Sequence, residues 1–251
     1  MTIVVAAIGA ILPSLLLLRY FYKRDLNPEP RGVLVKTFVF GVLIVVPVLI
    51  VALPLMALWP VSKSPVLYAL FAAFVCAAIP EEFFKFLVVT RYCARNPAFD
   101  EPMDGVVYGV TASLGFATLE NILYVADGGW PVALSRAFSA VPMHAFLGAI
   151  LGYYVGQAKL VEQSGVSARR GLWIAVLLHG LYDFGLLTVS QLAKQGTFDV
   201  NEPPVEQIGL ALGMLLMALV VLIVAGVWAW RIVRKLRRDQ LRARSRRDGV
   251  N

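Results

Sequence analysis

Hydrophobic residues occur along this chain in long runs with few polar interruptions, not in the short periodic patterns of a soluble domain. A helix needs roughly 20 residues to cross a hydrocarbon core about 30 Å thick. Runs of this kind predict seven membrane-spanning helices, near residues 2–18, 37–58, 66–90, 105–125, 132–156, 171–193 and 206–230. We therefore expect an all-α, polytopic helical membrane bundle that forms one domain over residues 1–230.

Composition supports the same class of protein. Of the 251 residues, 59% are apolar and only 16% are charged, which lies outside the range of soluble globular chains. The net charge of +7 could indicate a nucleic-acid partner. The distribution of the basic residues argues against that partner and for the lipid bilayer, so we expect a multi-pass protein of the cell membrane.

Lysine and arginine residues gather in alternate connectors. Most lie in the first, third and fifth connectors and after residue 230, whereas the intervening connectors hold only Lys63, Arg136 and Lys194. By the positive-inside rule, the N-terminus is predicted to face outward and the C-terminus the cytoplasm. Residues 231–251 are expected to form a basic cytoplasmic tail against anionic lipid head groups.

Four successive spans carry polar groups that are costly to place in lipid. A charged group at the centre of a membrane helix costs about 2.5–3.5 kcal/mol even on the mild insertion scale. Such groups need partners or water, so we expect them inside the bundle. In chain order they are Glu81, Glu82, Lys85, Glu120, Asn121, His144, His179 and Asp183.

The spacing of these residues predicts two local pairs. Residues four apart share a helix face, so Glu81 can meet Lys85 while Glu82 points about a quarter-turn away. His179 and Asp183 are also four apart, which would let the carboxylate orient the imidazole or share a ligand with it.

A row of small residues follows His144 at the same spacing, comprising Gly148, Gly152 and Gly156. Small residues let a neighbouring helix approach closely, so His144 is expected to face the bundle interior. Asn121 is expected to form a hydrogen bond between helices.

Several explanations remain open for these groups. A Glu81–Lys85 salt bridge could simply lock a helix, and a single buried histidine could bond a carbonyl. A proton- or ion-coupled transporter would also use buried acids and histidines, although we see neither internal repeats nor broken helices in the sequence. A bis-histidine haem protein would leave the carboxylates unexplained, and a non-catalytic membrane scaffold is a further alternative.

Three motifs resemble those of the PrsW-type intramembrane proteases, distant relatives of the CAAX prenyl proteases and bacteriocin-processing enzymes. E-E-F-F-K at 81–85 is similar to the paired-glutamate motif of that family, F-A-T-L-E-N at 116–121 to its second motif, and H-G-L-Y-D at 179–183 to its histidine motif. The segment D-E-P-M-D-G-V-V-Y-G at 100–109 and the His144–Gly148 pair add to the likeness.

The resemblance covers about residues 75 to 190 and departs from the CAAX proteases at one position. Glu120 stands where their second motif has a histidine, so their base pairing does not transfer directly. The resemblance implies an endopeptidase that hydrolyses a peptide bond of a membrane-embedded protein, with anti-sigma factors as the known theme of the family.

For the chemistry, we hypothesise that Glu81 or Glu82 acts as a general base on water, with Lys85 keeping the other carboxylate ionised. His144 and His179 then either bind a metal or stabilise the oxyanion. Two histidines and a carboxylate fit zinc, but the chain has no H-E-x-x-H motif, and metal-free glutamate catalysis is equally open. Glu120 could serve as base, ligand or supporting partner.

The estimated depths of these residues in the membrane differ, so it is open whether Glu120 lies in the same cavity as the others. At 1.5 Å per residue, Glu82 falls roughly 24 Å below the outer end of its span, whereas Glu120 falls roughly 8 Å below. His144 and His179 come out near mid-depth. A single cavity that includes Glu120 is therefore uncertain from the sequence.

Overall fold

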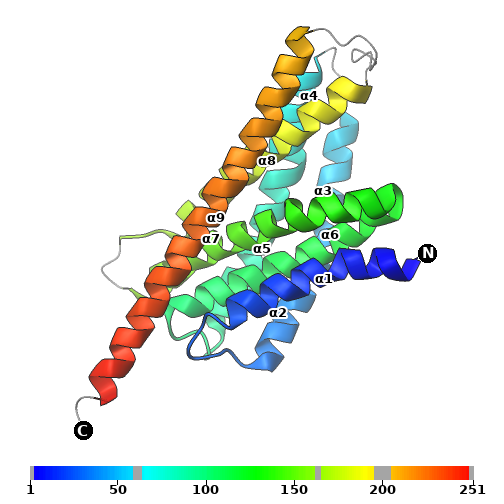
Figure 1. The fold of residues 1–251 in the computed structure, drawn as a ribbon. Helices are drawn as coiled ribbons and strands as arrows, with labels where there is room; N and C mark the ends of the chain where they lie inside the picture. Colours follow the sequence, from blue (N-terminus) through cyan, green and yellow to red (C-terminus); the bar gives the residue numbers. More distant parts are fainter. Residues whose placement is uncertain (1–2, 59–63, 162–164, 195–204, 249–251) are drawn as a thin grey trace.

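The computed structural model describes residues 3–58, 64–161, 165–194 and 205–248, and all regular structure in them is helical (Figure 1). The expected all-α class is thus confirmed. The helices are α1 (Ile3–Tyr22), α2 (Arg31–Leu43), α3 (Val45–Leu58), α4 (Pro65–Phe71), the π-helix η1 (Ala72–Ala78), α5 (Ile79–Leu87), the π-helix η2 (Val88–Tyr92), the 3₁₀-helix η3 (Cys93–Arg95), α6 (Pro102–Phe138), α7 (Ala140–Leu160), α8 (Ala168–Lys194) and α9 (Val205–Asp248).

Within the described residues, five helical stretches are long and apolar enough to cross a membrane. They are Arg31–Leu58, Pro65–Arg95, Pro102–Leu160, Ala168–Lys194 and Val205–Arg247. A shorter apolar helix covers Ile8–Tyr22. The fold is thus that of a multi-pass membrane protein. Because one stretch contains both the fourth and the fifth predicted spans, the count of seven stays a prediction.

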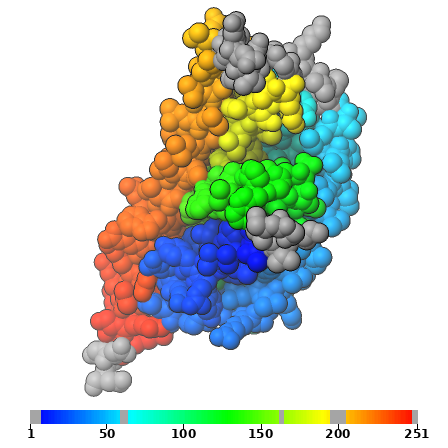
Figure 2. Space-filling model, turned by 45° about the vertical axis from the view of Figure 1, so that its right-hand side comes forward, coloured from blue at the N-terminus to red at the C-terminus, as the bar shows by residue number. Residues whose placement is uncertain are grey.

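The centre of the bundle is α6, which packs along α7 and is flanked by α1 and α2, while α8 and α9 pack on α7 (Figure 1). Every residue from Met103 to Thr118 on α6 is buried. In the space-filling view, α1 lies along the surface beside the green part of the chain, and α9 forms one flank (Figure 2). The first half of α6 is therefore the part of the core that other helices surround.

Close approach between α6 and α7 depends on glycine. A Cβ at Gly109 would overlap the carbonyl oxygen of Gly148, and a Cβ at Gly152 would overlap that of Gly105. The two backbones are in direct contact at these points, as the predicted row of small residues requires. This contact sets the separation of the helices that carry Glu120 and His144.

The run labelled α6 contains a break at Gly129, which has φ +65° and ψ −154° and is not helical. Such a φ suits glycine because it has no Cβ to clash. In a straight helix, residues 16 apart would be separated by about 24 Å. Instead, Nη2 of Arg136 lies 2.5 Å from Oε2 of Glu120. The segment after Gly129 therefore folds back beside the end of the first half of α6.

The helix that carries the two adjacent glutamates is irregular on both sides. The π-helices η1 and η2 flank α5, and Pro80 lies in the first turn of α5. Proline has no N–H to donate, so the regular hydrogen-bond ladder cannot pass through this point. Single π-turns are often found at functional sites. Here the change of helical register comes directly before Glu81 and Glu82.

The basic segment at the C-terminus continues the last helix. The predicted boundary at residue 230 falls inside α9, and Ile232, Val233 and Leu236 beyond it are buried. Gln240 on the same helix donates a hydrogen bond of 2.7 Å to Asp25 in the α1–α2 connector. This part of the tail is packed against the bundle and is not a separate extension.

We predict that Gly109→Ala lowers the free energy of unfolding by about 1–3 kcal/mol, because the new methyl group forces α6 and α7 apart. Thermal denaturation of the detergent-purified chain measures the change. Gly213→Ala on α9 is the matched control, since nothing lies within 4 Å of a Cβ at that position. Equal effects of the two substitutions would contradict the proposed role of the glycine contact.

Candidate active site

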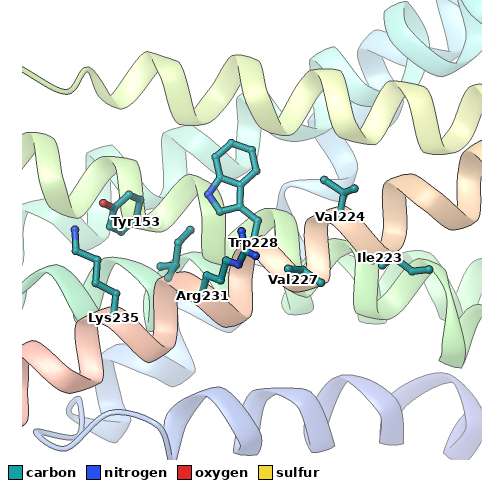
Figure 3. Close-up of a pocket in the computed structure, with 8 residues that line it drawn as sticks. Tyr153, Ile223, Val224, Val227, Trp228, Arg231 and Lys235 are labelled. Carbon is teal, nitrogen blue, oxygen red and sulfur yellow. The ribbon is translucent and has the colours of Figure 1, made fainter.

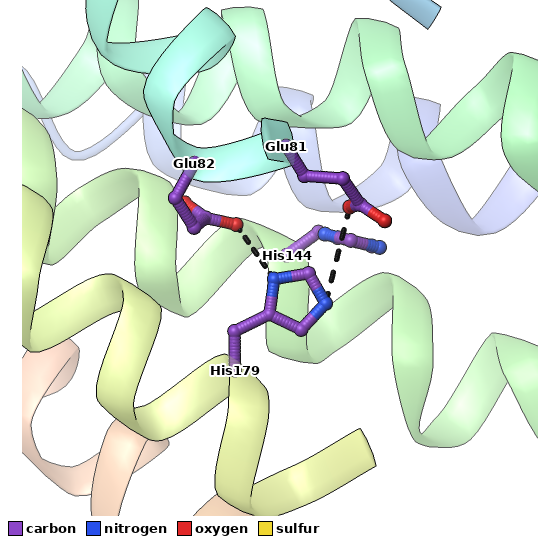
Figure 4. A group of neighbouring side chains, drawn as sticks. All are labelled: Glu81, Glu82, His144 and His179. Atoms are coloured by element: carbon purple, nitrogen blue, oxygen red, sulfur yellow. Dashed lines mark hydrogen bonds and ion pairs between the residues drawn. The ribbon is translucent and has the colours of Figure 1, made fainter. Parts of the chain in front are cut away.

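Four of the predicted site residues meet at one buried point in the bundle. Glu81 and Glu82 come from α5, His144 from α7 and His179 from α8, and each offers a donor atom within 4.8 Å of the others (Figure 4). All four are buried. Three helices that are distant in sequence thus assemble one group of carboxylates and imidazoles.

Lys85 lies at the centre of this group. Its Nζ donates hydrogen bonds to Glu82 Oε1 at 2.8 Å and to Glu81 Oε2 at 3.3 Å, and it lies 3.0 Å from Nδ1 of His144. The spacing argument favoured Glu81 as the partner of Lys85 and turned Glu82 away. The Glu81–Lys85 contact is confirmed, but the exclusion of Glu82 is wrong, because the long lysine side chain reaches the neighbour three residues back as well as the one four back.

His179 is held between two carboxylates. Its Nδ1 lies 2.9 Å from Glu82 Oε1, and its Nε2 lies 3.2 Å from Asp183 Oδ2 and 3.9 Å from Glu81 Oε2. The predicted pairing of His179 with Asp183 is therefore present. A histidine with an acid at each nitrogen is fixed in orientation and can hand a proton from one side to the other.

Glu120 belongs to the same constellation despite its expected shallow depth. Its Oε2 lies 3.0 Å from Nε2 of His144. Because the ammonium of Lys85 donates to Nδ1 of His144, the hydrogen on that ring belongs on Nε2, where it is donated to Glu120. The chain Glu82–Lys85–His144–Glu120 thus joins α5, α7 and α6 through polar contacts.

Arg136 was not among the predicted site residues, yet it completes this network. Its Nη2 donates to Glu120 at 2.5 Å and its Nε donates to Asn121 Oδ1 at 2.9 Å. Asn121 in turn donates to the carbonyl of Ala10 on α1 at 2.9 Å, which is the expected bond between helices. The one sequence signal for Arg136 was the turn-like G-G-W-P at 128–131, which allows the chain to fold back.

Exposure of the side chains increases from one edge of the cluster to the other. The side chains of Glu82 and Lys85 are 0% and 1% exposed, whereas those of Arg136, Glu120 and Asp183 are 14%, 18% and 24% exposed. The edge formed by Glu120 and Asp183 is therefore the part of the cluster that is nearest to the surface of the protein.

A groove of about 590 Å³ between α7 and α9 lies apart from this cluster (Figure 3). Tyr153 lines it on α7, and Trp228, Arg231 and Lys235 line it on α9. Its lining contains no carboxylate or histidine. It therefore has no group for acid–base catalysis at neutral pH, and the buried cluster is the better candidate for chemistry.

The buried cluster also has the donor set of a metal site. Two imidazoles and two carboxylates within 4.8 Å of one another fit a tetrahedral divalent ion. Oε2 of Glu82 is buried and accepts no hydrogen bond from any described residue. The residues present therefore fit a metal. His144 Nδ1, however, cannot bind an ion and Lys85 at the same time.

Comparison with known proteins gives a consistent result. A family model described as PrsW family intramembrane metalloprotease matches residues 29–227. "Protease PrsW" of Geobacillus kaustophilus (strain HTA426) is 40% identical over 184 residues, which cover 71% of this chain and 78% of the relative. "Protease PrsW" of Bacillus subtilis (strain 168) is 35% identical over 190 residues, which cover 72% and 83%.

A more distant relative, "Protease PrsW" of Clostridioides difficile (strain 630), is 31% identical over 187 residues, which cover 71% of this chain and 77% of the relative. No solved structure matches the chain. The matched region contains the whole cluster from Glu81 to Asp183. The chain is therefore a member of the PrsW family of intramembrane metalloproteases.

Proposed function

We propose that this chain is an intramembrane endopeptidase that hydrolyses a peptide bond of a membrane-embedded protein, with single-span proteins such as anti-sigma factors as the substrate class. The observation that carries the proposal is the meeting of two carboxylates, two imidazoles and one ammonium in a buried group with a partly exposed edge. Peptide hydrolysis needs a base for water, a proton donor for the leaving nitrogen and positive charge for the oxyanion.

Glu81 is the better placed of the two glutamates to act as the general base. Glu82 Oε1 is held by Lys85 at 2.8 Å and by His179 at 2.9 Å, and these donors stabilise its negative charge. Glu81 Oε2 has longer contacts, at 3.3 Å to Lys85 and 3.9 Å to His179. A carboxylate that is less firmly held is freer to accept a proton from water. Glu82 then serves as the anchor for Lys85 and His179.

His179 is positioned to move the proton. His179 carries a hydrogen on each ring nitrogen, because its Nδ1–H donates to Glu82 and its Nε2–H donates to Asp183 and faces Glu81. It can give the Nε2 proton to the nitrogen of the leaving group, and the proton that Glu81 takes from water then replaces it. Asp183 fixes the ring in this orientation, and Lys85 supplies positive charge beside the reacting atoms.

Glu120 and Arg136 act through His144. Glu120 accepts the Nε2 hydrogen of His144, and Arg136 compensates the charge of Glu120. This keeps the second nitrogen of His144 turned toward Lys85 and the carboxylates. We therefore assign Glu120 and Arg136 positioning roles, with Asn121 holding Arg136 against α1.

A divalent metal, with zinc as our first choice, would be held by Glu82, His144 and His179, in which case His179 would be a ligand in place of its proton-transfer role. This set has three protein ligands and an open position, as catalytic zinc sites do. Such an ion supplies Lewis-acid polarisation of the scissile carbonyl when it is bound. Lys85 has to release His144 Nδ1 before that nitrogen can become a ligand, so Lys85 and the ion compete for the same position.

We also propose seven crossings, with the N-terminus outside and the C-terminus in the cytoplasm. Contacts at one end of the bundle support this orientation. Gln240 donates to Asp25 in the first connector and to Glu101 in the third. Lys159, at the end of α7, donates to the carbonyl of Phe99 at 2.6 Å. The basic segments that are predicted to be cytoplasmic thus lie close to one another.

The three basic residues predicted on the outer side have different environments. Arg136 is paired with Glu120, Lys194 ends α8, and Lys63 lies outside the described residues. Arg136 is thus used inside the protein, so it does not oppose an outward location for its connector.

We predict that Glu81→Gln and His179→Ala each reduce cleavage by about 10²-fold or more, because removal of a general acid or base typically has this effect. Membrane proteomes of cells that make the wild-type chain or one of the variants give the measurement. An uncut single-span precursor should accumulate only with the variants. Glu206→Gln, an exposed acid at the start of α9, is the matched control and should cleave normally.

Two outcomes would count against the protease proposal. Normal precursor levels with both variants, at unchanged amounts of protein, would remove Glu81 and His179 from the chemistry. Proton-coupled solute uptake by vesicles that contain the purified wild-type chain, lost in Glu81→Gln, would favour the transporter alternative.

We predict a non-additive pair in the positioning network. Arg136→Gln leaves the Glu120 charge without its arginine partner, and we expect kcat to fall by about tenfold or more with little change in KM. The double variant Glu120→Gln/Arg136→Gln should show a decrease in kcat no larger than that of the worse single variant, because the charge to be compensated is gone. Kinetics on the reconstituted protein test this, with exposed Arg91→Gln as the control. Additive losses would contradict a shared role.

We predict that protein purified without chelators carries roughly one transition-metal ion per chain, and that chelation abolishes cleavage until the metal is restored. Element-resolved mass spectrometry identifies the ion. His144→Ala should lose the ion, whereas Glu206→Gln should retain it. Absence of metal together with full activity after chelation would leave Lys85 as the positive charge in the reaction.

A further inference from the structure

A second buried polar group lies outside the candidate active site, at the opposite end of the first half of α6. Asp25 and Glu29 in the α1–α2 connector and Asp104 at the start of α6 each offer an oxygen within 4.8 Å of the others. The three residues are 6%, 5% and 0% exposed. Three acids are thus gathered in an almost fully buried position.

Each of the two aspartates has one oxygen fixed by protein donors. Asp25 Oδ1 accepts hydrogen bonds from the backbone N–H of Asn27 at 2.9 Å and from the side chain of Gln240 at 2.7 Å. Asp104 Oδ2 accepts from the backbone N–H groups of Asp100 and Glu101, both at 2.7 Å. These hydrogen bonds to one oxygen fix the orientation of each carboxylate, and its second oxygen takes no part in them.

The second oxygens have no partner in the described part of the chain. Asp25 Oδ2 and Asp104 Oδ1 are buried and accept no hydrogen bond from any described residue. Glu29 Oε2 accepts a hydrogen bond from the hydroxyl of Tyr108. Two buried, unpartnered carboxylate oxygens in a group of three acids are costly unless a cation or a proton lies between them.

Basic side chains do not provide that cation. Among the described residues, no lysine or arginine forms a salt bridge with Asp25, Glu29 or Asp104. Arg244 on α9 donates instead to the carbonyl of Leu26 and to Asn27 Oδ1. The active-site group differs in this respect, because it contains Lys85.

We propose that Asp25, Glu29 and Asp104 bind a hard divalent cation, Mg²⁺ or Ca²⁺, at this end of the bundle. Carboxylate oxygens are the ligands that these two ions prefer, whereas zinc favours histidine and thiolate. The bound ion ties the α1–α2 connector to the start of α6. Through Gln240, which bonds both Asp25 and Glu101, it also holds the C-terminal part of α9 in place.

The alternative way to neutralise the group is a proton. Burial raises the pKa of Asp25 and of Glu29, so protonation is a real competitor for the cation. The two alternatives differ in one measurable property. A cation site makes the stability of the protein depend on the concentration of Mg²⁺ or Ca²⁺ at constant pH, whereas shared protons do not.

The experiment uses the full chain in detergent, first treated with EDTA and then titrated with Mg²⁺ alone or Ca²⁺ alone at constant pH and ionic strength. The Glu82→Gln/His179→Ala background removes binding at the candidate active site. We expect saturating cation to raise the Tm by about 4 °C or more. Asp25→Asn should abolish this rise, while Asp239→Asn, an exposed acid beside Gln240, should keep it.

Loss of folding in a cluster variant would not leave the proposal undecided. Electron paramagnetic resonance of added Mn²⁺ reports binding to the unaltered cluster in the same background, because the signal of the free ion decreases as it binds. We expect roughly one Mn²⁺ per chain, displaced by Mg²⁺ or by Ca²⁺. No bound Mn²⁺ and no cation-dependent change in Tm would overturn the cation site and leave the proton as the neutralising group.

Discussion

The ammonium of Lys85, buried among two carboxylates and an imidazole, is the interaction on which the rest of this structure depends. An ionised group is expensive to bury unless it is paired and hydrogen-bonded. Lys85 contacts Glu81, Glu82 and His144 within 3.3 Å, so each of these side chains is held by the same charge. The cluster therefore works as one unit, and loss of any partner leaves the others uncompensated inside the membrane.

Helix packing has to bring these charges within reach of one another. Backbone contact at Gly109 and Gly148 puts α6 and α7 close together, and the ring of Phe74 on η1 fills the space beside Gly180 of α8. The break at Gly129 then returns Arg136 to Glu120. In each case a glycine permits the close packing or the chain reversal that brings polar side chains of different helices into contact.

The sequence predicted the members of the cluster better than it predicted their contacts. Charges in lipid must be partnered, which identified Glu81, His144, His179 and the rest without a structure. Helical spacing also predicted the contact of His179 with Asp183. The sequence did not predict that Glu120 reaches His144. The depth of each residue in the membrane was estimated along straight helices, and such an estimate ignores helix tilt and breaks.

Two further features depend on tertiary contacts that no local pattern reveals. Arg136 lies 15 residues after Asn121, so its role follows only from the reversal at Gly129. Asp25 and Asp104 are 79 residues apart in the sequence, with α2 through η3 between them, and meet only because α1, α2 and α6 pack together. Hydrophobic patterning specifies which segments are helices, but long-range polar pairs are specified by the packing of those helices.

The position of α6 links the two polar groups. Asp104 and Glu120 lie on its first half, 16 residues and about 24 Å apart, and the one non-helical residue inside α6, Gly129, comes after both. The α1–α2 connector and α9 fix the end that carries Asp104, whereas α7 and Arg136 fix the end that carries Glu120. Both ends of this helical segment are thus held by polar contacts as well as by packing. The placement of Glu120 therefore rests on the packing of α6 as a whole, and contacts outside the cluster contribute to that packing.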